Sequence, residues 1–162
     1  MRIGVVSDTH GHIQNALAAA RMLEALDVAA ILHCGDIGSP QVPAAFSRWP
    51  THYVLGNVDH YEDELYAAAV VGAGGSFHGR FADLSLRSRK IALLHSDDAK
   101  KFREVTTSGA YDLVCYGHSH IAEQHQEGNT LILNPGALYR ANPHQIAIVD
   151  LDKMEALHVR VS

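Results

Sequence analysis

The stretch YDLVCYGHSH, residues 111–120, joins an apolar segment directly to two histidines. Leu113 to Tyr116 form a short apolar run of the kind found in buried strands. The run ends at a glycine, and His118 and His120 follow it one residue apart. In extended backbone, residues i and i+2 point to the same side. We therefore expect the chain to leave its core at this point and direct two imidazoles at one place.

Four other apolar runs are followed by the same kind of residue, with aspartate, asparagine or histidine within four residues of the end of the run. These residues are Asp8 and His10 after 3–6, Asp36 after 30–32, Asn57 and Asp59 after 53–55, and His95 after 91–94. In open α/β sheets, ligands bind at the carboxyl ends of the strands. Neighbouring strands would therefore bring these side chains together at one edge of the sheet.

Turn formation is the main alternative for some of these positions, because Asp and Asn are ordinary turn residues. For Asp36 or Asn57 taken alone, a turn would be sufficient explanation. Histidine has no such preference, yet four histidines lie at strand ends in step with the acidic and amide residues. We therefore predict a metal site with seven ligands: Asp8, His10, Asp36, Asn57, His95, His118 and His120.

The donor types indicate which metals such a site would hold. Imidazole, carboxylate and amide oxygen without thiolate suit Mn, Fe, Zn or Ni, and not a structural cysteine-zinc site. Seven donors are too many for one tetrahedral ion and favour two divalent ions that share a bridging carboxylate. Manganese is the expected metal, with Ni, Fe or Zn as alternatives.

The remaining sequence alternates strand and helix in its first half and is mostly strand in its second. Apolar periodicity predicts helices over 13–26, 41–48, 62–71 and 98–107, with 60–79 the least clear segment. It predicts strands over 2–7, 28–33, 52–55, 80–87, 90–95, 112–116, 121–126, 130–133, 145–150 and 155–161. The mixture predicts one α/β domain over residues 1–162, with two mixed sheets flanked by helices.

Composition excludes several classes of protein. The formal charge of −5 and the lack of any run of Lys or Arg argue against binding of duplex nucleic acid. No apolar run approaches the ~20 residues of a membrane span. The opening MRIGVVSDTHG resembles a first strand rather than a signal peptide, so we expect a cytoplasmic protein that does not bind membranes.

The motifs Asp8-x-His10, Gly35-Asp36, Gly56-Asn57-x-Asp59, His95 and Gly117-His118-Ser119-His120 resemble, in order, those of the calcineurin-like metallophosphoesterases. The SDTHG opening and the LNPGA segment are most similar to the small bacterial and archaeal phosphodiesterases of the YfcE/MJ0936 type. The resemblance extends roughly from residue 2 to 150 and implies a four-layer α/β/β/α sandwich. It also implies that Asp8, His10 and His120 hold one metal ion, that Asn57, His95 and His118 hold the other, and that Asp36 bridges them.

By the same resemblance, the protein would hydrolyse a small phosphoester, most readily a phosphodiester, by attack of a metal-bridging hydroxide, with Asp36 and Asn57 in the catalytic centre. The first alternative is a phosphomonoesterase or nucleotidase of the same fold. The second is a non-catalytic metal-binding scaffold, because one retromer subunit resembles this fold and serves chiefly in protein interaction. Retention of all seven ligand positions argues against the scaffold, and the length and charge argue against a nuclease.

Two positions depart from the family pattern. Val58 stands where many members have a histidine that can protonate the leaving group. His60 is a candidate substitute, with an exposed loop histidine as the alternative. Asp97 and Asp98 follow His95 where the family often has glycine, and a helix cap is the favoured interpretation of this acidic pair.

Two further points concern possible contacts of the protein. Asn134 and Arg140 could approach a substrate phosphate, although a turn is the first interpretation of the segment Asn134-Pro135-Gly136. A homodimer or homotetramer is possible through the last hairpin or the apolar stretch 65–71.

Overall fold

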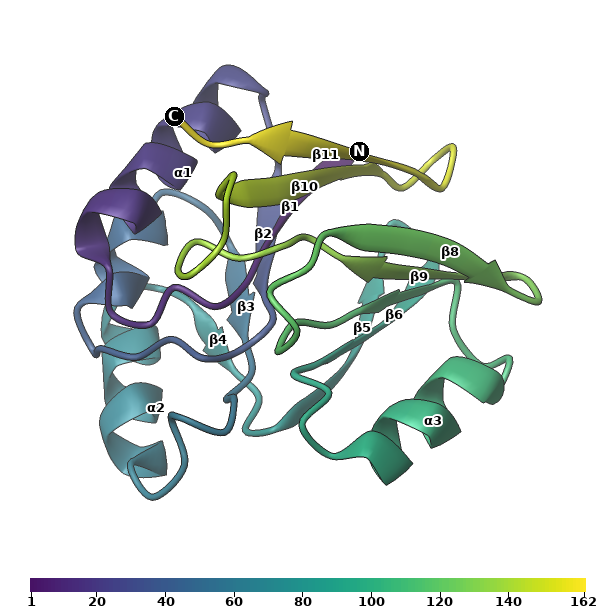
Figure 1. Cartoon of the computed structure of the whole chain (residues 1–162), viewed down its shortest axis with the longest axis horizontal. Helices are drawn as coiled ribbons and strands as arrows, with labels where there is room; N and C mark the ends of the chain where they lie inside the picture. The colour runs from purple at the N-terminus through teal and green to yellow at the C-terminus, as the bar shows by residue number, and fades with distance from the viewer.

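The computed structural model describes all 162 residues and contains two sheets between helices (Figure 1). The strands are β1 (Arg2–Val6), β2 (Ala30–His33), β3 (Thr51–Tyr53), β4 (Ser76–Phe77), β5 (Phe81–Leu86), β6 (Arg89–Leu94), β7 (Leu113–Cys115), β8 (Glu123–Glu127), β9 (Thr130–Asn134), β10 (Gln145–Asp150) and β11 (Glu155–Arg160). The helices are α1 (Ile13–Ala25), α2 (Asp63–Gly72), α3 (Ala99–Thr107) and the short 3-10 helix η1 (Val42–Phe46). One sheet has six strands in the order β11-β10-β1-β2-β3-β4, and the other has five in the order β5-β6-β7-β9-β8.

Three apolar clusters hold the layers together. Ile3 of β1 and Leu93 of β6 belong to the cluster between the two sheets. Leu23 of α1 belongs to a second cluster on the outer face of the six-stranded sheet, which α1 and α2 cover (Figure 1). Val105 of α3 packs in a third cluster with Ile132 of β9, on the outer face of the other sheet. The predicted four-layer α/β/β/α arrangement is confirmed.

The pairing of the strands brings the carboxyl ends of several of them to one edge. Strands β1, β2 and β3 are parallel neighbours, with Val6 opposite His33 and His33 opposite Tyr53. In the second sheet, β6, β7 and β9 are also parallel neighbours. Parallel strands end on the same side, so the loops after all these strands lie close together, as the sequence pattern required.

The observed elements follow the predicted ones closely, with one strand missed. Strand β4 lies within 60–79, the segment whose sequence was least clear, and it pairs with β3 through Ser76 and Phe77. A strand of two residues is too short to show an alternation of apolar and polar residues in the sequence. Strand β3 also ends at Tyr53, two residues before the predicted end, and the N–H of Leu55 donates to the carbonyl of Gly79 after β4.

The start of α3 confirms the expected helix cap. The carboxylate of Asp98 accepts a hydrogen bond from the backbone N–H of Lys101 at 3.1 Å, which satisfies one of the unpaired donors in the first turn. Asp97 forms an ion pair with Arg80 instead. None of the helices is both long enough and apolar enough to cross a membrane.

Candidate metal centre

The loops after β1, β2, β3, β6 and β7 meet around a cleft at the carboxyl edge of the strands. The cleft has a volume of about 410 Å³. The residues that line it are His10, Asp36, Asn57, Val58, His118, His120, Tyr139 and Arg140. Asp8 and His95 lie beneath it and are almost fully buried. All seven side chains expected from the sequence are therefore assembled at one place.

The donors fall into two groups in which every donor atom lies within 4.8 Å of the others. One group contains Asp8, His10 and His120, and the other contains Asp36, His95 and His118. The family resemblance implied the same placement of Asp8, His10 and His120 in one group and of His95 and His118 in the other, but it assigned Asp36 to both groups. In the first group, Nε2 of His120 lies 3.2 Å from Oδ1 of Asp8. In the second, Nε2 of His95 lies 3.1 Å from Oδ2 of Asp36.

Asp36 lies between the two groups and touches both. Its Oδ2 atom is 3.1 Å from His95 and 3.3 Å from Nε2 of His10, which belongs to the other group. Asn57 joins the second group through its Oδ1 atom, which lies 3.1 Å from Nδ1 of His118. The arrangement is suited to a carboxylate shared by two ions, with a neutral amide oxygen at one side.

Hydrogen bonds hold one oxygen of each carboxylate and leave the other directed at the cleft. Oδ2 of Asp8 accepts from the hydroxyl of Ser7 at 2.6 Å and from the backbone N–H of His118 at 3.1 Å. Oδ1 of Asp36 accepts from the backbone N–H of Val58 at 3.0 Å. The remaining oxygens, Oδ1 of Asp8 and Oδ2 of Asp36, face the histidines.

Three buried polar atoms at the bottom of the cleft have no hydrogen-bond partner: Oδ1 of Asp8, Nε2 of His10 and Nε2 of His95. Buried polar atoms are nearly always satisfied, so three together need an explanation. The ring of His95 is oriented through its other nitrogen, since Nδ1 lies 2.8 Å from the carbonyl of Cys34 and Nε2 then presents its lone pair to the cleft. The donor set therefore fits divalent cations.

The backbone at the cleft is strained. Five of the seven expected ligands have positive φ angles: Asp8 (54°), His10 (45°), Asp36 (53°), His118 (73°) and His120 (62°). Residues other than glycine rarely adopt this conformation, and such residues cluster at functional sites. The strain directs successive side chains inward from tight loops, at the expense of local stability.

Glycines allow the loops to approach one another closely. A Cβ atom on Gly56 would lie 2.1 Å from Oδ1 of Asp36, and one on Gly117 would lie 2.0 Å from Oγ of Ser7 and 2.7 Å from Oδ2 of Asp8. No side chain can occupy these positions without displacing a carboxylate. The glycines in the Gly35-Asp36, Gly56-Asn57 and Gly117-His118 motifs therefore serve the geometry of the site.

The two carboxylates favour positive charge on the imidazoles that face them. The carboxylates of Asp36 and Asp8 raise the pKa of His10 to about 9. Burial by itself would lower the pKa of His95, but the nearby Asp36 raises it overall. Burial would likewise raise the pKa of Asp36, yet His10 and His95 hold it well below its usual value. Bound cations would supply the same positive charge and displace these protons.

Asp59 has a structural role beside the cleft. It is fully buried and accepts hydrogen bonds from the backbone N–H groups of Ile37, Gly38 and Gly56 at 2.9–3.0 Å. It therefore ties the loop after β2 to the loop after β3. No histidine is among its hydrogen-bond partners.

His33 lies under the cleft, although its position within a predicted strand gave no reason to single it out. It is fully buried, and burial lowers its pKa to about 4. Its Nδ1 atom accepts from the N–H of Gly35 at 3.2 Å, and its Nε2 atom lies 3.1 Å from the hydroxyl of Thr9. A neutral His33 thus connects the two loops that carry Asp8 and Asp36.

Tyr139 and Arg140 complete the wall of the cleft, and nothing in the sequence pattern singled out Tyr139. The side-chain amide of Asn134 donates to the carbonyl of Gly117 and to the hydroxyl of Ser119, both at 3.1 Å. The turn after β9 is therefore anchored to the loop of the two histidines. This anchoring brings the segment that follows the turn to the cleft.

His60, the candidate acid for the leaving group, is exposed and does not line the cleft. Its ring packs against that of Tyr61, with 4.1 Å between the ring centres. Val58, which occupies the position of the family histidine, does line the cleft and is 47% exposed. The role of His60 stays a prediction from the sequence.

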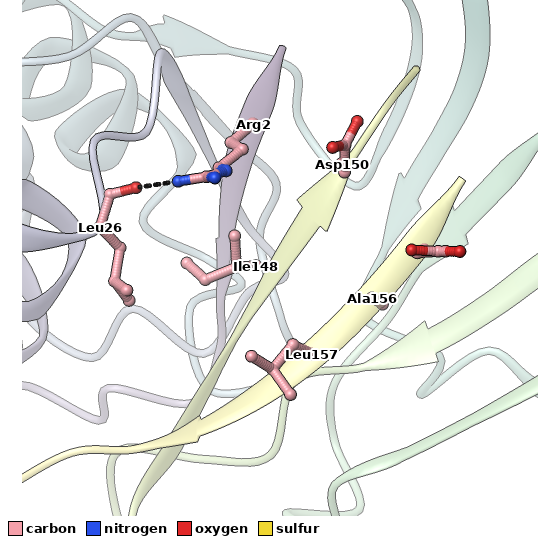
Figure 2. Close-up of a pocket in the computed structure, with 7 residues that line it drawn as sticks. Arg2, Leu26, Ile148, Asp150, Ala156 and Leu157 are labelled. Carbon is pink, nitrogen blue, oxygen red and sulfur yellow. Dashed lines mark hydrogen bonds between the residues drawn. The ribbon is translucent and has the colours of Figure 1, made fainter. Parts of the chain in front are cut away.

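A second cavity, of about 500 Å³, lies at the opposite end of the six-stranded sheet (Figure 2). Its wall is mainly apolar and contains Leu26, Ile148 and Leu157. The guanidinium of Arg2 is hydrogen-bonded to the carbonyl of Leu26 at 3.4 Å, as Figure 2 shows. No histidine lines this cavity, and both groups of clustered donor atoms lie at the cleft instead.

Comparison with known proteins agrees with the geometry. Residues 1–154 match the calcineurin-like phosphoesterase superfamily domain. The chain is 28% identical over 159 residues to phosphodiesterase MJ0936 of Methanocaldococcus jannaschii, and the match covers 96% of each chain. A solved archaeal phosphodiesterase superimposes with a TM-score of 0.91 at 26% identity, over 99% of this chain and all of that one. The phosphoesterase YfcE of E. coli has the same fold, with a TM-score of 0.71 at 16% identity over the whole of both chains. The chain therefore belongs to the calcineurin-like phosphoesterase superfamily, a family of phosphoric ester hydrolases.

Proposed function

We propose that the protein is a phosphodiesterase that hydrolyses small phosphodiesters with two divalent cations. The observation that carries this proposal is the pair of donor groups around Asp36, with three buried donor atoms that have no partner within the protein. The similarity to phosphodiesterase MJ0936 and to the archaeal phosphodiesterase structure supports the choice of a diester over a monoester.

The geometry and the family resemblance together support one assignment of residues to the two cations. Asp8, His10 and His120 would bind the first ion, Asn57, His95 and His118 the second, and Asp36 both. Cations bound there supply the charge that acidifies a water molecule and stabilises the charge that develops on the phosphoryl oxygens. The mixture of imidazole, carboxylate and amide donors suits manganese, and Ni, Fe or Zn would fit the same donors.

The protein's own charges favour an anionic substrate once the cations are bound. Asp8 and Asp36 are the only carboxylates among the seven donors, so two divalent cations leave a local charge of about +2. This local charge attracts phosphate although the chain as a whole carries a charge of −5. The cleft volume of about 410 Å³ is in the range of pockets for small molecules.

The test compares two substrates after removal and return of metal. The protein is stripped with chelator, Mn²⁺ is restored, and hydrolysis of bis-p-nitrophenyl phosphate is compared with that of p-nitrophenyl phosphate. We expect no turnover without metal and, with Mn²⁺, faster hydrolysis of the diester than of the monoester. Faster hydrolysis of the monoester would favour a phosphomonoesterase or nucleotidase. Binding of two ions without hydrolysis of either ester would favour the scaffold.

A further inference from the structure

Arg140 is the one side chain with a permanent positive charge among the residues that line the cleft. It is exposed, and no carboxylate lies within ion-pair distance of it, whereas Arg80, Arg87 and Arg89 are each paired with an aspartate. An arginine without a partner beside a cleft is available to bind an anion from solution.

The backbone holds Arg140 against the candidate metal ligands. Its φ angle is 46°, a left-handed conformation that glycine would adopt more readily than arginine. Its carbonyl oxygen lies 3.4 Å from Nδ1 of His120. The residue thus shares the strained conformation of the ligands and is tied to one of them, which is typical of positions that serve a site.

Tyr139 supports the guanidinium. The guanidinium carbon of Arg140 lies 5.2 Å from the centre of the Tyr139 ring, at a distance that allows a cation–π interaction. The other neighbours of this ring are His12, stacked at 4.5 Å, and His10 at 4.9 Å. The contact with Tyr139 therefore places the exposed side chain of Arg140 beside the first donor group.

We propose that Arg140, held by Tyr139 beside the first donor group, is a substrate-binding residue that contacts the phosphoryl oxygens of the phosphoester. The planar guanidinium presents a fork of N–H donors that matches phosphate oxygens. The inference rests on the proposed function, because Arg140 would bind the phosphoryl group of the same substrate. Lysine could supply the charge at this position but not the two parallel hydrogen bonds.

The experiment measures phosphate binding separately from turnover. Protein loaded with Mn²⁺ is titrated with inorganic phosphate by calorimetry, and KM and kcat are measured for bis-p-nitrophenyl phosphate. The variants are Arg140→Gln and Arg140→Lys. Arg103→Gln is the matched control, because it removes the same charge from an exposed position on α3 outside the cleft. The Mn²⁺ content of each protein is measured and made equal before comparison.

We expect Arg140→Gln to weaken phosphate binding by about tenfold or more and to raise KM by a similar factor, as for loss of a hydrogen bond between charged groups. Arg140→Lys should recover part of the loss, and Arg103→Gln should stay within about twofold of wild type. Phosphate affinity and KM that are unchanged in Arg140→Gln at equal Mn²⁺ content would overturn the inference and leave Arg140 as a support for Tyr139.

The two proposals fail in different ways. If wild-type protein binds phosphate but hydrolyses neither nitrophenyl ester, the proposed function fails. The phosphate titrations of the variants would still decide the role of Arg140, because they require no turnover.

Discussion

Two hollows at opposite ends of the six-stranded sheet differ in chemistry more than in size. The cavity of about 500 Å³ in Figure 2 is lined mainly by residues of β1, β10 and β11, and its Arg2 donates a hydrogen bond to the carbonyl of Leu26. The cleft of about 410 Å³ contains buried donor atoms without partners and a strained backbone. The comparison teaches that unsatisfied buried donors, and not cavity volume, locate the chemistry of this protein.

The difference also shows how a strained site persists. Strand β1 belongs to both ends, since Arg2 lies at the apolar cavity and Asp8 follows its other end. Between these ends, Ile3 and Val5 are fully buried in the cluster between the sheets. Each left-handed residue at the cleft costs about 1–3 kcal/mol. The buried core must therefore hold the loops in this strained conformation. Bound cations would offset the repulsion between the carboxylates of Asp8 and Asp36.

The largest effect is expected from loss of the shared carboxylate. Asp36→Asn removes the charge that faces both His10 and His95, so turnover with Mn²⁺ should fall by at least about 100-fold, together with metal content. Glu155→Gln makes the matching change in the apolar cavity and should alter turnover by less than about twofold. Rates and metal content near wild type in Asp36→Asn would remove Asp36 from the centre of the site.

Replacement of glycine by alanine should have opposite effects on the free energy of unfolding at the cleft and at an exposed position. Gly56→Ala would place a Cβ atom 2.1 Å from the Asp36 carboxylate and 2.4 Å from its backbone nitrogen. We expect a loss of about 3 kcal/mol in the free energy of unfolding, measured with denaturant, and weaker metal binding. Gly72→Ala is the control, because it has no neighbour within 4 Å and lies in α2. It should stabilise the protein by about 0.5–1 kcal/mol, and an equal response at both positions would refute the close approach.

The buried His33 should make the protein less stable in acid. Its folded pKa of about 4 lies below the ordinary value of 6.5, so below pH 6.5 the unfolded chain binds a proton that the folded chain does not. Stability should therefore fall as the pH falls, by about 2 kcal/mol between pH 7 and 5 from this group alone. In chelator-treated protein, His33→Gln should remove that part of the pH dependence, whereas His125→Gln, at an exposed site, should not. The same pH dependence in His33→Gln and wild type would contradict the assignment.

The smallest effect is expected at His60, which is exposed and lies outside the cleft lining. His60→Ala should lower the rate by less than about threefold, both for an aryl diester and for a diester with a poor alkyl leaving group. A loss confined to the poor leaving group would instead identify His60 as the acid and would require its loop to move toward Asn57.

The sequence was sufficient to predict most of the fold and the gathering of the seven expected side chains at one place, because the apolar runs mark the strands and the polar residues after them mark one sheet edge. Asp8 and His118 could be found without knowledge of which strands pair. Strand β4 was missed, because its two residues form a strand only through their pairing with β3 at the edge of the sheet. Division of the ligands between two ions came only from the family resemblance.

Other features depend on contacts between distant loops and could not be read from local pattern. In the sequence, His33 cannot be distinguished from an ordinary strand residue. Its role follows only from its hydrogen bonds with Thr9 and Gly35 in the structure. Tyr139 reaches the cleft because Asn134 anchors its turn to the histidine loop. The sequence marked Asp59 only as a polar residue after an apolar run, and its three hydrogen bonds from backbone N–H groups define its structural role.

The most direct test of the account is to locate the metal ions in crystals grown with Mn²⁺, by anomalous diffraction. We expect two peaks in the cleft, one among Asp8, His10 and His120 and one among Asn57, His95 and His118, with Asp36 touching both. A single peak, or peaks that leave His95 and the Asp8 carboxylate without a ligand contact, would contradict the two-cation site.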